Sequence, residues 1–102
     1  MAEIQPMSEA MYYALLALAE PGHGYAVMQR VHTLSGGRLE MGPGTLYGLL
    51  ARMKREGLIS LTAEGPRRKV YALTPAGRRA LLGEYRRLKQ MVADGSGLEG
   101  YQ

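Results

Sequence analysis

Apolar residues recur at helical spacing along the first 56 residues of the chain. Within residues 8–19, 24–34 and 43–56 they fall three or four positions apart, which predicts three amphipathic helices. Pro21 follows the first of these segments and Gly57 follows the third, at points where a helix-breaking or helix-capping residue is expected. We therefore predict three short helices in succession, joined by turns.

The pattern changes to that of extended strands after the third helix. Residues 58–63 and 69–73 are short, are rich in strand-favouring side chains and flank a Gly-Pro pair, so they predict a hairpin. Thr74 and Pro75 suit the cap and the first turn of a final helix at residues 75–93. The predicted fold class is mainly α with a small two-stranded β-hairpin. This order of elements is that of a winged helix-turn-helix followed by one more helix.

The final helix carries a narrow apolar stripe. Its members are spaced four, three and four positions apart: Leu81, Tyr85, Leu88 and Val92. Such a stripe has the width of a coiled-coil seam and is too narrow to cover a globular core alone. We expect it to pair with the same helix of a second copy, with Met11 and Leu15 of the first helix at the same interface. The alternative is that the stripe packs on its own domain.

The net charge of +4 conceals an uneven distribution of charge. All 13 Lys and Arg residues lie between Arg30 and Lys89, a segment with only four acidic residues and hence a balance of +9. Both flanking segments are acidic. A basic middle of this kind favours a polyanionic partner such as nucleic acid. The alternative is a soluble surface with scattered arginines.

Several classes of protein are excluded by what the sequence lacks. It has no Cys, which excludes disulfides, thiolate zinc sites and cysteine nucleophiles. His23 and His32 are nine residues apart without accompanying acids, a poor metal site, so His23 is interpreted as a turn or helix-cap residue. We find no catalytic motif, apolar membrane span or signal peptide. We therefore expect a cytoplasmic protein that is not an enzyme and needs no metal or cofactor.

The third predicted helix has an unusual outer face, opposite its apolar stripe. That face combines small, hydroxyl-bearing and basic residues: Gly44, Thr45, Tyr47, Gly48, Ala51, Arg52 and Arg55. A glycine inside a helix costs about 1 kcal/mol relative to alanine, so Gly48 suggests that something must approach closely there. A helix of this kind, followed by a basic hairpin, is typical of a protein that reads DNA in the major groove.

Each candidate residue for DNA binding has an expected role. Thr45 and Tyr47 would bond phosphate oxygens, which position the protein on DNA without reading sequence. Arg52 is the candidate for a bidentate contact to guanine, worth ~1–3 kcal/mol of discrimination. The tip of the hairpin would reach the minor groove through three basic residues: Arg67, Arg68 and Lys69. The alternative is that these basic side chains are solvated and that Tyr47 fills an edge of the core.

These assignments divide the chain into three parts. Residues 1–74 form the winged helix-turn-helix DNA-binding domain, and residues 75–93 form the dimerisation helix. Residues 94–102 are rich in glycine, which predicts a flexible tail.

The motifs, taken in this order, resemble those of the PadR family of bacterial transcriptional regulators. The resemblance covers about residues 8–92. It is carried by five strings: Pro21-Gly-His-Gly-Tyr25, Gly42-Pro-Gly-Thr-Leu-Tyr47, Glu56-Gly-Leu-Ile59, Arg68-Lys-Val-Tyr71 and Leu73-Thr-Pro-Ala-Gly-Arg78. The family more usually has Ser or Thr at position 42. The last string is shared with other winged-helix families such as MarR.

The resemblance implies a homodimeric regulator, usually a repressor, that binds double-stranded DNA and dimerises through its C-terminal helix. Short members of the family often bind a small, flat aromatic effector at the dimer interface, in some cases by stacking it on a Trp. This chain has no Trp and no Phe, and Tyr85 is the aromatic residue on the expected seam. Two alternatives stay open: a winged-helix protein-interaction module, and a small-molecule-binding protein built around the dimer groove.

Overall fold

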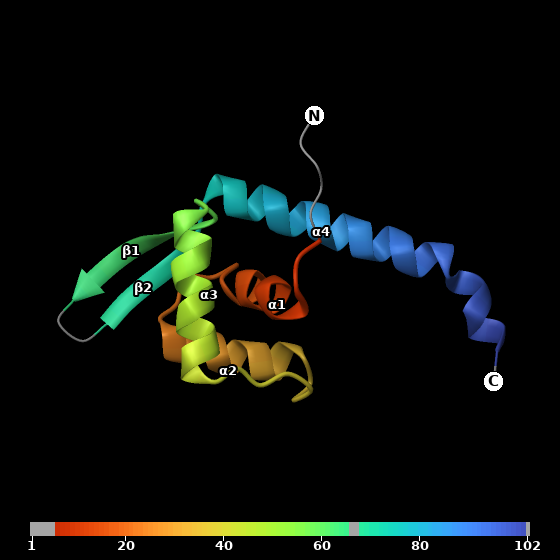
Figure 1. Ribbon diagram of the computed structural model, residues 1–102, viewed down its shortest axis with the longest axis horizontal. Coiled ribbons are helices and arrows are strands. Elements are labelled where there is room, and N and C mark those ends of the chain that lie inside the picture. The colour runs from red at the N-terminus through yellow and green to blue at the C-terminus, as the bar shows by residue number, and fades with distance from the viewer. Residues whose placement is uncertain (1–5, 66–67, 102) are drawn as a thin grey trace.

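The computed structural model describes residues 6–65 and 68–101 (Figure 1). Its elements follow the predicted order, which confirms the predicted fold class. They are α1 (Glu9–Ala17), α2 (Gly24–Leu34), α3 (Pro43–Arg55), β1 (Ile59–Gly65), β2 (Arg68–Leu73), α4 (Pro75–Asp94) and the short 3-10 helix η1 (Ser96–Gly100). Among the described residues, no helix is long and apolar enough to cross a membrane.

Side-chain caps explain where three of the helices begin. Ser8, His23 and Thr74 each accept a hydrogen bond from the backbone amide three residues further on, at 3.1, 3.2 and 3.0 Å. These bonds satisfy amide groups that have no partner within the helix. Gly57 follows α3 with a φ of +75°, the left-handed conformation that ends many helices. The predicted capping roles of His23, Gly57 and Thr74 are confirmed.

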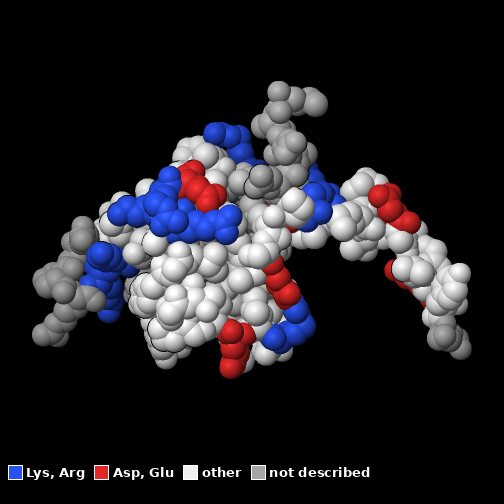
Figure 2. Space-filling view, viewed as in Figure 1, with Lys and Arg blue, Asp and Glu red and all other residues white. Residues whose placement is uncertain are grey.

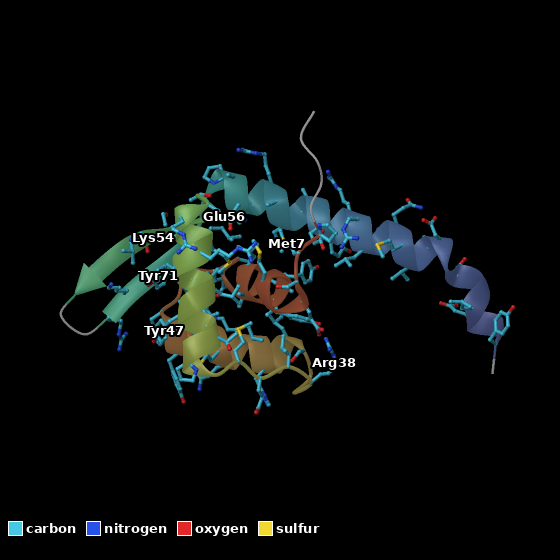
Figure 3. The ribbon with its side chains drawn as sticks, in the orientation of Figure 1. Met7, Arg38, Tyr47, Lys54, Glu56 and Tyr71 are labelled. Carbon is cyan, nitrogen blue, oxygen red and sulfur yellow. The ribbon has the colours of Figure 1, made fainter. Side chains whose placement is uncertain are left out.

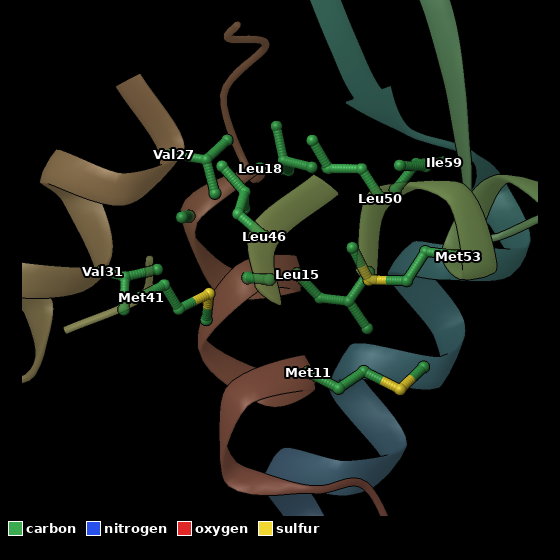
Figure 4. Packing of buried hydrophobic residues seen from close by; sticks show 12 residues of the cluster. Met11, Leu15, Leu18, Val27, Val31, Met41, Leu46, Leu50, Met53 and Ile59 are labelled. Atoms are coloured by element: carbon green, nitrogen blue, oxygen red, sulfur yellow. The ribbon is translucent and has the colours of Figure 1, made fainter. Parts of the chain in front are cut away.

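The core lies between α1, α2 and α3 and is closed by the start of β1 (Figure 4). Its largest fully buried side chains are Leu15, Leu18, Val27, Val31, Leu46, Leu50, Met53 and Ile59. Three of them come from the predicted apolar stripe of α3, whose fourth member, Leu49, is half-buried. Because this stripe faces inward, the opposite face of α3 is turned to solvent.

Met11 and Leu15, which we expected at a dimer interface, lie inside the protomer. Their side chains are 6% and 0% exposed because α1 is surrounded by α2, α3 and α4. Their apolar surface is therefore used in the protomer's own core.

The two strands form an antiparallel hairpin whose base is tied to the turn after α1. Ile59 pairs with Leu73, and the register shifts by one residue between Leu61 and Ala63. Gly22 and Tyr71 exchange two backbone hydrogen bonds, at 3.0 and 2.9 Å. The hairpin is thus anchored at its base, while β1 and β2 extend away from the helices (Figure 1).

The last helix runs past α1 and then projects from the body of the molecule (Figure 1). Beyond it, the segment we expected to be a flexible tail forms the 3-10 helix η1. Two side chains of the last described residues, Leu98 and Tyr101, are exposed.

Candidate nucleic-acid interface

The outer face of α3 is open to solvent at both of its internal glycines. A Cβ placed on Gly44 or on Gly48 would meet nothing within 4 Å. No part of the described protomer therefore requires glycine at these positions. The close approach that we inferred from Gly48 is not made within the protomer.

The start of α3 differs from the starts of the other three α-helices. Its cap residue is Gly42, which has no side chain, and no side-chain hydrogen bond closes the first turn. Pro43 follows and has no amide hydrogen to satisfy. The remaining amides of this turn point out of the helix end, where the helix dipole favours an anion. The hydroxyl-bearing Thr45 lies exposed in the same turn.

The Tyr47 ring packs against Gly24 of α2. A Cβ on Gly24 would come within 2.8 Å of the Tyr47 hydroxyl oxygen, so the absence of a side chain makes room for the ring. The Tyr47 side chain nevertheless remains 53% exposed. Figure 3 shows it near the start of α3, beside α2. The starts of these two helices and one phenol therefore form a continuous surface.

A further aromatic residue, Tyr25, is exposed at the start of α2. It follows Gly24 in the first turn of α2, and its side chain is 60% exposed. A large aromatic side chain left in solvent at a helix start is a signal for a contact surface. The helical spacing of apolar residues within 24–34 does not distinguish Tyr25 from the buried residues of α2, because spacing alone cannot show which side chains a neighbouring element covers.

Basic side chains gather at the other end of α3. Lys54 and Arg55 are exposed in its last turn, and Lys54 and Glu56 lie at that end in Figure 3. Arg52 donates a hydrogen bond from Nε to Glu56 Oε2 at 2.7 Å, in an exposed i,i+4 ion pair. The four-residue spacing of this pair could have been read from the sequence. A bidentate contact from Arg52 would therefore use its two terminal nitrogens.

The hairpin adds exposed basic side chains next to α3. Arg68 and Lys69 lie on β2 with exposed side chains. Arg67, the third basic residue predicted at the tip, lies outside the described residues. Figure 2 shows Lys and Arg over the end of α3 and over the hairpin on the same side of the molecule.

Part of the basic middle of the chain is used within the protomer. Arg30 donates hydrogen bonds to the carbonyls of Ala17, Glu20 and Pro21 at 3.0, 2.8 and 3.2 Å, so it closes the end of α1. Arg38 forms an ion pair with Glu9, which raises the pKa of the guanidinium. Arg87 is bonded to Glu84. The positive charge available to a partner is therefore smaller than the count of basic residues indicates. It is divided between α3, the hairpin and α4, where Arg78, Arg79, Arg86 and Lys89 are exposed.

The apolar stripe of α4 is divided between the protomer and solvent. Leu81 packs on the core and Leu88 is half-buried, whereas Tyr85 is half-exposed and Val92 is 74% exposed. Three further apolar side chains beside or beyond the stripe are exposed: Leu82, Met91 and Leu98. The described protomer thus covers only part of the apolar stripe of α4.

A buried acid lies where α4 crosses α1. Glu84 is 5% exposed and accepts hydrogen bonds from Arg87, at 2.6 and 2.8 Å, and from the amide of Met7 at 3.2 Å. The Arg87 guanidinium holds the pKa of this carboxyl below its ordinary value. Next to it lies a groove of about 310 Å³, lined in part by Tyr12, Tyr13 and Leu88. Burial and the neighbouring Tyr85 raise the pKa of Tyr12.

The fold and the exposed face of α3 define a winged helix-turn-helix protein. Residues 13–82 match the Transcriptional regulator PadR-like family. This match covers well over half of the chain, and the chain belongs to that family. The PadR-like proteins are transcriptional regulators rather than enzymes, in agreement with the lack of a catalytic motif.

Two curated relatives share part of the sequence. An uncharacterized 37.1 kDa protein in transposon TN4556 of Streptomyces fradiae is 44% identical over 75 residues, 72% of this chain and 21% of the relative. The Transcriptional regulator Rv3488 of Mycobacterium tuberculosis is 40% identical over 55 residues, 51% of each chain. This chain therefore spans only part of the length of both relatives.

Solved structures share the fold over most of its length. A PadR-like transcription factor from Bacteroides fragilis is 32% identical, with a TM-score of 0.73, and the match covers 87% of this chain and 88% of that one. A PadR-like transcriptional regulator from Bacillus cereus is 24% identical, with a TM-score of 0.72 over 91% and 93% of the two chains. The second likeness concerns the fold alone.

Proposed function

We propose that this transcriptional regulator binds double-stranded DNA by inserting α3 in the major groove and placing the hairpin along the flanking minor groove. The observation that carries the proposal is the outer face of α3. A Cβ on Gly44 or Gly48 would meet nothing within 4 Å there, and the same face carries the exposed phenol of Tyr47 and ends in basic residues. Glycine is unfavourable inside a helix, so its use on an open face is explained best by close approach of a partner.

The residues of this face divide by role. The uncapped start of α3, the Thr45 hydroxyl and the Tyr47 hydroxyl are placed to bond phosphate oxygens, which fixes the protein on the duplex. Arg52 contacts a guanine edge, and Arg55 lies one turn further on. Arg68 and Lys69, together with Arg67, contact the minor groove from the hairpin.

The second element of the proposal is a homodimer formed through α4. Its exposed apolar residues, with Tyr85 and Val92 at the centre, need a cover that the described protomer does not supply. A two-fold dimer binds an inverted repeat whose half-sites are ~34–36 Å apart. Binding at such an operator within a promoter would repress transcription by excluding the polymerase.

The groove between α1 and α4 is the place that suits a small aromatic effector best. That groove contains aromatic side chains, Tyr12 and Tyr13, and it adjoins the helix that would carry the dimer contact. A small aromatic molecule bound there would alter the position of α4 relative to α3. It could shift DNA affinity only by its difference in affinity for the two arrangements.

The proposal is tested by fluorescence anisotropy with the duplex upstream of the protein's own gene and a scrambled duplex. We expect tight binding to the first alone, with the logarithm of affinity falling linearly with the logarithm of salt concentration. Thr45→Ala and Tyr47→Phe should weaken binding to both duplexes alike, because they remove phosphate contacts. Absence of salt-dependent binding to any promoter duplex would reject DNA reading in favour of a protein-binding or ligand-binding role.

A further inference from the structure

The side of α4 that is turned away from the protein body carries basic side chains along half of its length. The helix packs on the body through Gly77, Leu81 and Glu84. Four exposed basic residues lie on the opposite side, which we call the basic face of α4: Arg78, Arg79, Arg86 and Lys89. At 3.6 residues per turn they fall within an arc of about 100°, and they extend about 16 Å along the helix axis.

The described protomer supplies no acid to neutralise the basic face. None of the ion pairs formed among the described residues involves one of its four residues. The acids of α4 are engaged elsewhere, since Glu84 is bonded to Arg87 and Asp94 accepts a hydrogen bond from Gln90 at 2.8 Å. Two residues of the basic face also lie in the first turn of α4, where the helix dipole disfavours a cation. The face therefore favours an anionic partner.

An apolar side chain lies at the centre of the basic face. Leu82 is 45% exposed, and the four basic residues lie three, four or seven positions from it, one or two helical turns away. An apolar centre with a charged rim rich in arginine is the arrangement found at protein interfaces. Arginine also presents a planar set of donors that matches a carboxylate. A phosphate backbone would leave Leu82 against charged oxygens, so the face suits an acidic protein better than a nucleic acid.

The basic face lies apart from the surface proposed to bind DNA. Tyr47 lies near the start of α3, whereas Lys54 and Glu56 lie at its other end, beside the start of α4 (Figure 3). Figure 2 shows basic side chains along the upper edge of the molecule, where α4 lies in Figure 1. The basic face also differs from the apolar stripe of α4, since their centres are about 100° apart around the helix. All three surfaces can therefore be occupied at once.

We propose that the basic face of α4 binds an acidic segment of a partner protein. An apolar side chain of that segment packs on Leu82, and carboxylates on either side of it pair with the surrounding arginines and Lys89. This inference goes beyond the proposed function and does not depend on it. A regulator that holds DNA through α3 can hold such a partner through α4 at the same time, which would bring the partner to the same promoter.

The test uses the whole chain and three fluorescent helical peptides of about 15 residues, a length at which an isolated helix can form. The first peptide has a central leucine with glutamates one turn to either side, the second has serine in place of the leucine, and the third has glutamine in place of the glutamates. Anisotropy at low salt should show binding of the first peptide, and much weaker binding of the other two. The affinity should fall as salt is added.

Two double variants that remove the same charge identify the surface. Arg79→Gln with Arg86→Gln should weaken binding of the first peptide roughly fivefold, since each exposed ion pair contributes modestly. Arg68→Gln with Lys69→Gln, on the hairpin, should leave peptide binding unchanged. Leu82→Ser should reduce the affinity for the first peptide to that for the serine peptide. Circular dichroism and sedimentation should show that all these variants keep the fold and the oligomeric state of the wild type.

The remaining outcomes separate this inference from its rivals. Equal binding of the leucine and serine peptides would show attraction of charge alone and overturn the proposal, as would peptide binding that none of the α4 variants changes. If Arg79→Gln with Arg86→Gln instead lowers the affinity for duplex DNA and its salt dependence, the basic face belongs to the DNA-binding surface and the proposal fails. A chain that binds the peptide through α4 but binds no duplex would support this inference and reject the proposed function.

Discussion

Gly77, in the first turn of α4, lies so close to the backbone carbonyl of Leu58 that a Cβ would overlap it. Two hydrogen bonds hold this junction. The Thr74 amide donates to the Leu58 carbonyl at 3.0 Å, and the Thr74 hydroxyl donates to the Gly57 carbonyl at 2.6 Å. The start of α4 is therefore fixed on the turn between α3 and β1. This junction connects the helix proposed to read DNA with the helix proposed to dimerise.

We expect Gly77→Ala to lower the free energy of unfolding by about 1–3 kcal/mol, because the added methyl group displaces backbone rather than a flexible side chain. Urea denaturation followed by circular dichroism measures the change. Gly83→Ala is the matched control, since it lies in the same helix and a Cβ there meets nothing within 4 Å. That variant should be stabilised by roughly 0.5–1 kcal/mol. Equal stabilisation of both variants would contradict the tight junction.

Arg30 should be more important for stability than its partly exposed position on α2 indicates. Its guanidinium bonds three carbonyls at the end of α1, and Lys cannot reproduce this planar arrangement of donors. We expect Arg30→Lys to lower the midpoint of urea denaturation, by about 1–2 kcal/mol in unfolding free energy. Gln29→Ala, at the exposed neighbouring position, is the control. An unchanged midpoint for Arg30→Lys would show that water replaces these bonds without loss.

Stability at acid pH should depend on Glu84. Its pKa in the folded protein is lowered by Arg87, so the carboxylate contributes stability above the unfolded pKa of about 4.3. This contribution is lost as the pH falls through the lower folded pKa. Unfolding free energies measured between pH 7 and pH 2 should therefore fall less steeply for Glu84→Gln than for wild type. Glu99→Gln, on the exposed η1, serves as the control. Parallel curves for wild type and Glu84→Gln would contradict the assignment.

The local features of this fold could be predicted because they depend on neighbours in sequence. The predicted ends of every helix and strand agree with the structure to within two residues, since Ser8, Thr74 and Gly57 act on amides and carbonyls close by. The inward stripe of α3 follows from its periodicity alone. These features can be predicted without knowing how the helices and strands pack against one another.

The remaining features depend on contacts between distant segments. Periodicity placed Met11 and Leu15 on one face of a helix but could not show that the protomer itself covers that face. Likewise, the fit of Tyr47 against Gly24 joins residues of two helices, and no spacing rule connects them. The candidate face of α3 was found because glycine, hydroxyl and basic residues share one side of a single helix.

Arg52 should determine sequence preference, whereas Arg55 should not if it contacts phosphate alone. We expect Arg52→Ala to reduce discrimination between the operator and a duplex changed at one guanine by ~1–3 kcal/mol. Arg55→Ala should weaken binding to both duplexes alike and reduce the salt slope by about one unit. Competition anisotropy at several salt concentrations separates these effects. If Arg52→Ala leaves the preference intact, the ion pair with Glu56 is its main role.

Gly48 offers the sharpest test, because its replacement should change stability and DNA affinity in opposite directions. Within the described residues a Cβ at Gly48 meets nothing within 4 Å, so Gly48→Ala should raise the free energy of unfolding by roughly 0.5–1 kcal/mol through helix propensity. The same methyl group would lie between α3 and the floor of the major groove, so DNA affinity should fall. Gly83→Ala supplies the comparison, with the same gain in stability and no change in affinity. Unchanged or tighter DNA binding by Gly48→Ala would show that this face of α3 does not closely approach DNA.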